Sequence, residues 1–240
     1  MIGTVIKAEL RNMTRDRMYL VFSFYPVLLG IIGYFLVDYI ESQVAPDNLA
    51  PEILSMFLIL MTGYIFGALI AFTLLDDKDD FVLMSLKITP ISVKSYVIVK
   101  LIVAFIFGFI ATIVITLATG FLPEATVWNV LLISIAGALQ APGVALIVNS
   151  FSSNKVEGFV VMKLSGLILI IPVLAFFIMD WQEMFLVFAP GFWPARMIQI
   201  ELLPNFNTNF NFVMYFLLGV IYNMLFLSLF MKIYSKKSNL

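Results

Sequence analysis

Ionisable side chains are concentrated in residues 76–100 of this 240-residue chain, which read DDKDDFVLMSLKITPISVKSYVIVK. The four acids at positions 76–80 could hold Mg²⁺ together with a substrate phosphate, because this ion prefers carboxylate oxygens. No second acidic cluster accompanies them, and the chain has no histidine and no cysteine. Thiol nucleophiles, thiolate metal sites and histidine bases are therefore excluded, and we expect no bound metal; an enzyme remains a minor alternative.

The composition indicates an integral membrane protein. Hydrophobic residues make up 62% of the chain and charged residues 12%, with a mean hydropathy of +1.05, well above the apolar content of a soluble domain. A helix needs roughly 20 apolar residues to cross the hydrocarbon layer. We therefore predict one all-α domain, residues 1–240, with six transmembrane helices at about 18–37, 53–75, 97–119, 128–149, 159–179 and 212–232.

Two local features refine these spans. The first apolar run is too long for the core of a signal peptide, and no small-residue cleavage site follows it, so we expect it to remain as a span. Pro26, Pro142 and Pro172 lie inside the first, fourth and fifth spans. Proline removes a helical hydrogen bond, so each predicts a kink.

Basic residues are distributed unevenly between the connections. Of the 14 Lys and Arg residues, 13 fall on one side of the predicted membrane, and only Arg196 falls on the other. The opposite side carries most of the acids outside residues 76–80: Asp38, Glu41, Asp47, Glu52, Glu124, Asp180, Glu183 and Glu201. The positive-inside rule then predicts a multi-pass cell-membrane protein with both termini in the cytosol. The net charge of −1 gives no indication of a nucleic-acid partner.

The segment before the first span, residues 1–17, predicts an amphipathic helix. Its apolar residues recur near helical spacing, and its cations fall on the opposite face: Ile2, Val5, Ile6, Leu10 and Met13 against Lys7, Arg11 and Arg15. Such a helix lies in the membrane interface, beside the lipid headgroups. A basic tail that only sets the topology is the alternative.

Residues 76–100 fall on the cytosolic side, between spans two and three. Asp79 or Asp80 can cap a short helix, and Thr89-Pro90 suits the start of the following one. The short helix presents apolar residues, among them Phe81, Met84 and Ile88, which a solvated loop would not explain. We predict a docking surface for a soluble partner, formed by Asp77, Lys78, Asp79, Phe81, Leu83, Met84, Leu86, Thr89 and Pro90.

Few polar groups lie inside the spans. For Gln140, Asn149 and Asn223, substrate contact and hydrogen bonding between helices are both open. Aromatic and methionine residues of span two either line an apolar route or face lipid. The candidate substrate route is Phe57, Met61, Tyr64, Gln140 and Asn149. No acid lies within a proposed span, which disfavours a proton-coupled secondary transporter.

The connection before the last span, residues 180–211, is too apolar for open solvent and too interrupted to cross the membrane. It contains the aromatic, proline-rich sequence FAPGFWPARMI, with Pro190, Trp193 and Pro194. We predict a re-entrant or interfacial pair of short helices here, anchored by aromatic residues at headgroup level.

Taken together, these features resemble the ABC type-2 exporter permeases, over nearly the whole chain. The most specific match is local: Asp77-Lys78-Asp79, Leu83, Leu86, Thr89-Pro90, Ser92, Tyr96 and Lys100. Phe81 departs from the pattern, because the family usually has glycine there. FAPGFWPARMI is similar to the family's re-entrant motif, and the short loops resemble the drug-export permeases named for fluoroquinolones.

The resemblance implies a membrane permease subunit, not an enzyme, that exports a hydrophobic or amphiphilic, drug-like substrate. The chain contains no G-x-x-x-x-G-K-[ST] loop for ATP phosphates, so no cofactor is expected in it. ATP and Mg²⁺ would bind to two separate cytosolic ATPase subunits, and residues 76–100 would couple them to the membrane helices. A second copy or a related permease would complete the route, within membrane lipid; a lipid, peptide or bacteriocin is the alternative cargo.

Overall fold

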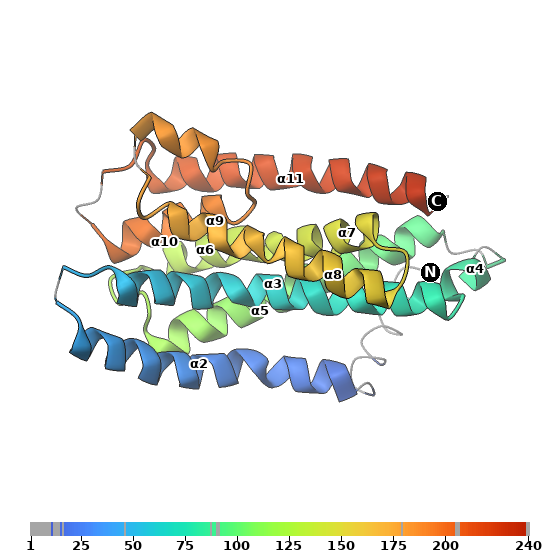
Figure 1. Ribbon diagram of the computed structural model, residues 1–240, viewed down its shortest axis with the longest axis horizontal. Helices are drawn as coiled ribbons and strands as arrows, with labels where there is room; N and C mark the ends of the chain where they lie inside the picture. Colours follow the sequence, from blue (N-terminus) through green and yellow to red (C-terminus); the bar gives the residue numbers. More distant parts are fainter. Residues whose placement is uncertain are drawn as a thin grey trace.

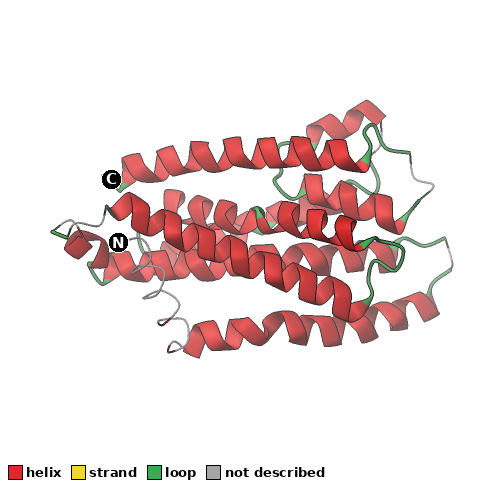
Figure 2. Cartoon of the chain, turned by 180° about the vertical axis from the view of Figure 1, so that it is seen from behind, coloured by secondary structure: helices red, strands yellow, loops and turns green. Residues whose placement is uncertain are grey.

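The computed structural model describes residues 11, 15, 17–45, 47–86, 88–89, 92–178, 180–204 and 207–238. These residues form a bundle of long helices, in which the start of α2, the end of α11 and α4 lie at the same end (Figure 1), and the regular elements are helices (Figure 2). The elements are α2 (Arg17–Gln43), α3 (Ala50–Asp79), α4 (Val82–Leu86), α5 (Val93–Thr119), α6 (Val127–Ala138), α7 (Gln140–Phe151), α8 (Lys155–Ser165), α9 (Leu167–Leu174), η1 (Asp180–Phe185), α10 (Phe192–Leu202) and α11 (Phe212–Lys237).

Six candidate membrane spans are present among the described residues, as the sequence predicts. They are α2, α3, α5, the pair α6 and α7, the pair α8 and α9, and α11. Several observed helices extend beyond the predicted spans, most clearly α3, which starts at Ala50 and ends at Asp79, whereas the fifth span ends at Leu174, five residues before its predicted end. The interfacial helix predicted for residues 1–17 lies outside the described residues, apart from Arg11, Arg15 and the first residue of α2.

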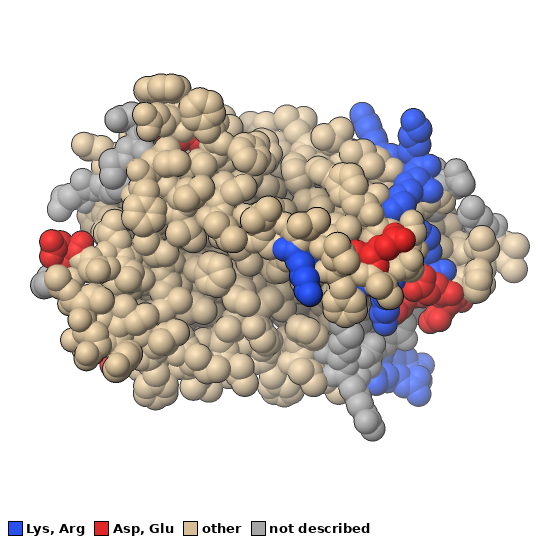
Figure 3. Space-filling view, in the orientation of Figure 1, with Lys and Arg blue, Asp and Glu red and all other residues tan. Residues whose placement is uncertain are grey.

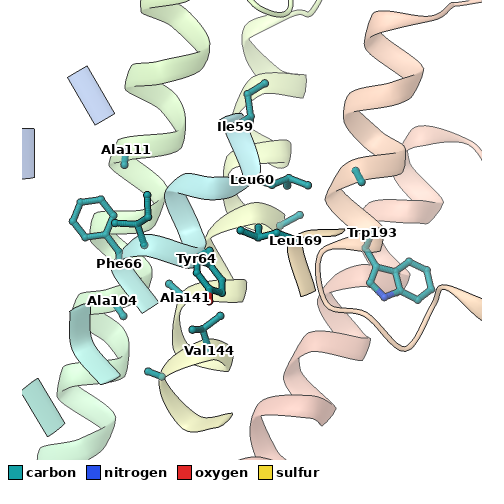
Figure 4. Close-up of a cluster of buried hydrophobic side chains, with 14 of the residues drawn as sticks. Ile59, Leu60, Tyr64, Phe66, Ala104, Ala111, Ala141, Val144, Leu169 and Trp193 are labelled. Atoms are coloured by element: carbon teal, nitrogen blue, oxygen red, sulfur yellow. The ribbon is translucent and has the colours of Figure 1, made fainter. Parts of the chain in front are cut away.

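Helix α3 is the centre of the bundle and is buried along most of its length. Helices α6 and α7 pack closely against α3 because small residues form the contacts. A methyl group added to Gly63 would lie 2.6 Å from the carbonyl oxygen of Gly137, and one added to Gly67 would lie 2.5 Å from that of Ala141. Glycine spaced by four residues lets two helix backbones approach in this way. Figure 4 shows Ala141 and Val144 of α7 beside Tyr64 of α3, whereas Phe66 of α3 lies on the side of Ala104 and Ala111 of α5.

Hydrogen bonds between polar side chains add specificity to this contact. Thr62 of α3 and Thr112 of α5 share a hydrogen bond of 2.8 Å between their hydroxyl oxygens. Asn149 of α7 donates from Nδ2 to the carbonyl oxygen of Ala71 of α3, at 3.1 Å. In an apolar bundle such bonds satisfy buried donors across two helices, so they favour one register between them.

The fourth and fifth spans are each interrupted. The kink predicted from Pro142 appears as a break at Leu139, between α6 and α7. Proline has no N–H, and its ring crowds the carbonyl four residues earlier, here that of Ala138, the last residue of α6. The fifth span breaks at Gly166, six residues before the predicted kink at Pro172, which lies inside α9.

Two cap predictions near residue 80 are wrong. Asp79 ends α3 and Asp80 caps its C-terminus, so neither opens α4. The next membrane helix begins at Val93, where the Ser92 hydroxyl accepts a hydrogen bond from the Ser95 N–H. Thr89 instead donates its hydroxyl to the Leu86 carbonyl, at the end of α4; Pro90 lies outside the described residues.

Candidate functional site

The end of α3 and the short helix α4 form an exposed tip at the end of the bundle where α2 begins and α11 ends (Figure 1). The chain turns at Phe81, whose φ of 59° is in the left-handed region. Residues with a Cβ are disfavoured there and glycine is not. This conformation accounts for the glycine that the resembling family has at this position.

The apolar residues predicted for docking divide into an anchor and an exposed group. Leu83 is 7% exposed and holds α4 against the bundle. Phe81 is 64% exposed, Met84 65% and Ile88 91%. We call these last three residues the α4 apolar group. Leu86 is half-buried and the Pro90 of the prediction is outside the described residues.

An ion pair braces the base of the tip. Lys100 of α5 places its Nζ 2.6 Å from the carboxylate of Asp77, and the Tyr96 hydroxyl donates to the same oxygen at 2.9 Å. The Lys100 side chain is 5% exposed. The motif residues Asp77, Tyr96 and Lys100 therefore contact each other, across the ends of α3 and α5. The Asp77 carboxylate is thus engaged within the chain through its Oδ2, and contact between Asp77 and a partner stays a prediction.

The four clustered acids point to different neighbours. Asp76 pairs with Lys155 of α8 at 2.5 Å, on the surface, whereas Asp79 and Asp80 are exposed beside the half-buried Lys78. Among the described residues, no group of three or more His, Asp or Glu side chains is arranged to hold a metal ion. Figure 3 shows most Lys and Arg side chains of the visible face gathered at this end of the molecule.

The residues predicted to form a substrate route have mixed positions. Tyr64 donates its hydroxyl to the Met162 carbonyl of α8 at 2.7 Å, and Asn149 bonds to α3 as described above. These two side chains hold helices together. Gln140 is buried and donates to the Gly137 carbonyl, while its Oε1 has no partner among the described residues. Phe57 and Met61 are partly buried against the core.

A buried charge cluster connects the segment before α11 to the bundle, and sequence reasoning missed it. Arg196 of α10 lies 2.8 Å from the carboxylate of Glu183 of η1, and both side chains are 1% exposed. Arg196 also donates to the carbonyls of Ala175 and Ile178, at 2.7 and 2.6 Å. Asn209 and Tyr215 donate to Glu183 at 2.7 and 2.8 Å.

One signal in the sequence could have found this cluster. Arg196 is the single basic residue on the acidic side, inside an apolar segment. A cation in such surroundings needs a buried partner, because leaving its charge uncompensated is costly. Glu183 is the acid that meets it, and together they join η1, α10 and the end of α9.

The aromatic segment around α10 packs deep in the bundle. Pro190, Trp193 and Pro194 are buried, and a methyl group added to Gly191 would lie 2.7 Å from Oε1 of Gln140 in the fourth span. Trp193 packs on Gly219 of α11, whose added methyl group would lie 2.6 Å from its Cβ. The segment before α11 thus contacts two spans away from their ends.

A cavity of about 600 Å³ opens at the end of the bundle opposite α4. It lies between α2, α3, the α5–α6 connection and the end of α10, and its lining includes five acids: Asp38, Glu41, Glu52, Glu124 and Glu201. Burial raises the pKa of Glu201, while a hydrogen bond from Asn129 lowers it in part. The two ends of the molecule therefore differ in charge, as the sequence predicts for its two sides.

Comparison with known proteins gives a match over most of the chain. The family model described as "Fluoroquinolones export permease protein Rv2686c-like" matches residues 9–231. Two curated relatives, both named fluoroquinolones export permease proteins, come from Mycobacterium tuberculosis strains CDC 1551 / Oshkosh and ATCC 25618 / H37Rv. Each is 27% identical over 148 residues, which is 61% of this chain and 58% of the relative.

Proposed function

Since this chain belongs to the Rv2686c-like family of fluoroquinolone export permeases, we propose that it is the membrane subunit of an ATP-driven ABC exporter. Membership confirms the drug-export resemblance drawn from the sequence. In this proposal the chain moves a hydrophobic or amphiphilic, drug-like compound out of the cytosol. Two separate ATPase subunits bind ATP and Mg²⁺, and residues 76–100 couple them to spans two and three.

The α4 apolar group is the observation that carries this proposal. Phe81, Met84 and Ile88 are exposed at the charged end of the bundle, outside the candidate membrane spans. Apolar groups clustered in that position favour contact with another protein. Large aromatic anchors of this kind supply much of the binding energy at protein interfaces.

The brace below the tip supports a role in transmitting motion. Asp77, Lys100 and Tyr96 join α3 to α5 near the end of α3, and α4, with its buried Leu83, packs on α3. Displacement of α4 by a partner would therefore move both membrane helices together. Each of α3 and α5 is a continuous helix, which also favours the transmission of motion from α4 along them.

The remaining parts of the proposal follow the charge distribution. Basic residues gather at the end that carries α4 and the termini, which favours the cytosol for that end of a cell-membrane protein. The interrupted, buried segment of η1 and α10 then acts as a re-entrant element on the opposite side, and residues 1–17 lie in the cytosolic interface. Two permeases, identical or related, complete the transport route.

The proposal is tested by purifying the chain with the ATPase encoded nearest to it and measuring export from cells. Phe81→Ala should insert at normal abundance but retain at least tenfold less ATPase, since truncating an aromatic anchor costs roughly 2 kcal/mol or more. Phe35→Ala, an equally exposed phenylalanine in α2, is the matched control and should bind normally. Normal assembly and export by Phe81→Ala and by a Phe81→Ala/Met84→Ala double variant would show that α4 does not couple.

The same export assay separates the possible cargoes. A fluoroquinolone, a labelled phospholipid and an amphiphilic peptide are offered in turn to cells that express the chain with its ATPase. We expect resistance to, and reduced accumulation of, the fluoroquinolone. Transport of the lipid or peptide alone would leave the coupling intact and change the cargo.

A further inference from the structure

A groove on the surface of the spans lies between α5, α7 and α11. It has a volume of about 380 Å³. Ile98 and Ile102 of α5 form one wall, Leu227 and Met231 of α11 form the other, and α7 forms the floor, which includes Leu146. Its polar exception, Ser228, donates its own hydroxyl to the Met224 carbonyl at 2.8 Å. The groove therefore offers apolar contact and almost no hydrogen bonding.

Two lysines stand at one end of this groove. Lys94 lies one helical turn before Ile98, and Lys232 lies one turn after Ser228. α5 begins, and α11 ends, at the end of the bundle that carries α4, so the two cations lie at the same membrane surface (Figure 1). Both side chains are exposed, and no ion pair joins either of them to a described residue.

We propose that this groove binds an anionic glycerophospholipid, with one acyl chain between α5 and α11 and the phosphate between Lys94 and Lys232. An acyl chain needs an apolar channel that opens onto the bilayer, and the groove provides one. Basic groups between membrane helices at the lipid–water boundary attract anionic headgroups. The apolar lining thus matches the acyl chain of the phospholipid, and the two lysines match its phosphate.

The other candidate occupants fit less well. Binding sites for drug-like molecules carry a few placed polar groups that fix orientation, and the one polar lining residue, Ser228, is already satisfied within its helix. A second copy related by twofold symmetry would bring Lys94 and Lys232 toward their own equivalents, which places like charges together. The inference does not depend on the ATPase partner or on the cargo.

The test is native mass spectrometry of the purified chain in detergent micelles that contain equal amounts of phosphatidylglycerol and phosphatidylcholine. We expect one phosphatidylglycerol to be retained per chain in preference to phosphatidylcholine. Each lysine near the surface should contribute about fivefold to this preference. The preference should therefore fall about 25-fold in the Lys94→Gln/Lys232→Gln variant, because the two contributions multiply. Both changes lie on exposed side chains, which folding tolerates.

Two further variants separate the groove from general charge effects. Leu101→Trp, on a groove-lining residue of α5, should release both lipids by filling the channel. Lys163→Gln, an exposed cation on α8, should change nothing. Equal retention of the two lipids by the unmodified chain, or an unchanged preference in Lys94→Gln/Lys232→Gln, would overturn the proposal. So would a change of oligomeric state in Leu101→Trp with the lipid still bound.

Discussion

The buried pair of Glu183 and Arg196 gives the sharpest test of how the segment before α11 is held. We predict that Arg196→Gln destabilises the protein strongly. The substitution removes the ion pair and leaves the carbonyls of Ala175 and Ile178 without their donor. Glu183 would then remain buried with only the neutral donors Asn209 and Tyr215.

The size of the effect follows from burial. Removing one partner of a buried ion pair costs about 3–5 kcal/mol, because the other charge is left uncompensated. For a chain of this length, 1 kcal/mol corresponds to roughly 2–4 °C in melting temperature. We therefore expect Arg196→Gln to melt about 10 °C below the unmodified protein, measured by intrinsic fluorescence in detergent.

A double-mutant cycle distinguishes this pair from a general packing defect. The Glu183→Gln/Arg196→Gln variant has no unpaired charge, so it should be more stable than the two single effects predict, by about 1–3 kcal/mol. Lys155→Gln breaks the exposed pair with Asp76 and should lower the melting temperature by about 4 °C at most, since surface pairs contribute about 0–1 kcal/mol. Strictly additive single effects, or an equal shift in Lys155→Gln, would refute the reasoning.

Four further outcomes are expected. In intact cells an impermeant maleimide should label Ser42→Cys but not Ser153→Cys, because the proposed orientation places Ser42 outside the cell and Ser153 in the cytosol. The chain has no cysteine of its own to react, and the reverse labelling pattern would invert the orientation. Phe81→Gly should raise the melting temperature slightly, since it relieves a left-handed residue with a side chain, yet weaken ATPase retention as Phe81→Ala does. Gly67→Val should abolish folded yield, because even its Cβ would lie 2.5 Å from the Ala141 carbonyl oxygen, whereas Gly143→Ala, with 3.5 Å to its nearest neighbour, should fold. Burial raises the pKa of Glu201, so the folded state prefers its protonated form, and the stability present at low pH is lost as pH rises through the raised pKa. Glu201→Gln should therefore raise the free energy of unfolding at pH 8 but not at pH 4, as measured by denaturation at the two pH values.

The number of candidate spans could be predicted from the sequence, because runs of apolar residues need no tertiary information to be recognised, and the described residues contain six helices long and apolar enough to span. The tip was predicted less well, since the helix caps expected at Asp79 or Asp80 and at Thr89-Pro90 are not the observed ones. Phe81 was noted only as a departure from the family's glycine, and its left-handed backbone became apparent in the structure. Sequence reasoning did not reveal the ion pair of Asp77 with Lys100, which lies 23 positions away on the next membrane helix. An ion pair of this range depends on how the helices pack.

The cluster around Arg196 shows the same limit more strongly. Its carbonyl acceptors belong to Ala175 and Ile178, and backbone oxygens leave no mark in a sequence. The break at Leu139 could be placed approximately from Pro142, whereas the one at Gly166 had no proline beside it. What could be predicted was the content of each helix, and what could not was the set of contacts between them.

The length of α3 has a mechanical consequence. Its 30 residues make a rod of about 45 Å, roughly half as long again as the hydrocarbon layer is thick. No proline interrupts it beyond its first turn, and its glycines are clamped against α6 and α7. Such a rod tilts as a whole instead of bending, with the Gly63–Gly67 contact near its midpoint as the fulcrum. A tilt of about 5° at that point would swing each end by about 2 Å. The acidic cavity, which α3 borders through Pro51, Glu52 and Ser55, would therefore change shape whenever the opposite tip is displaced.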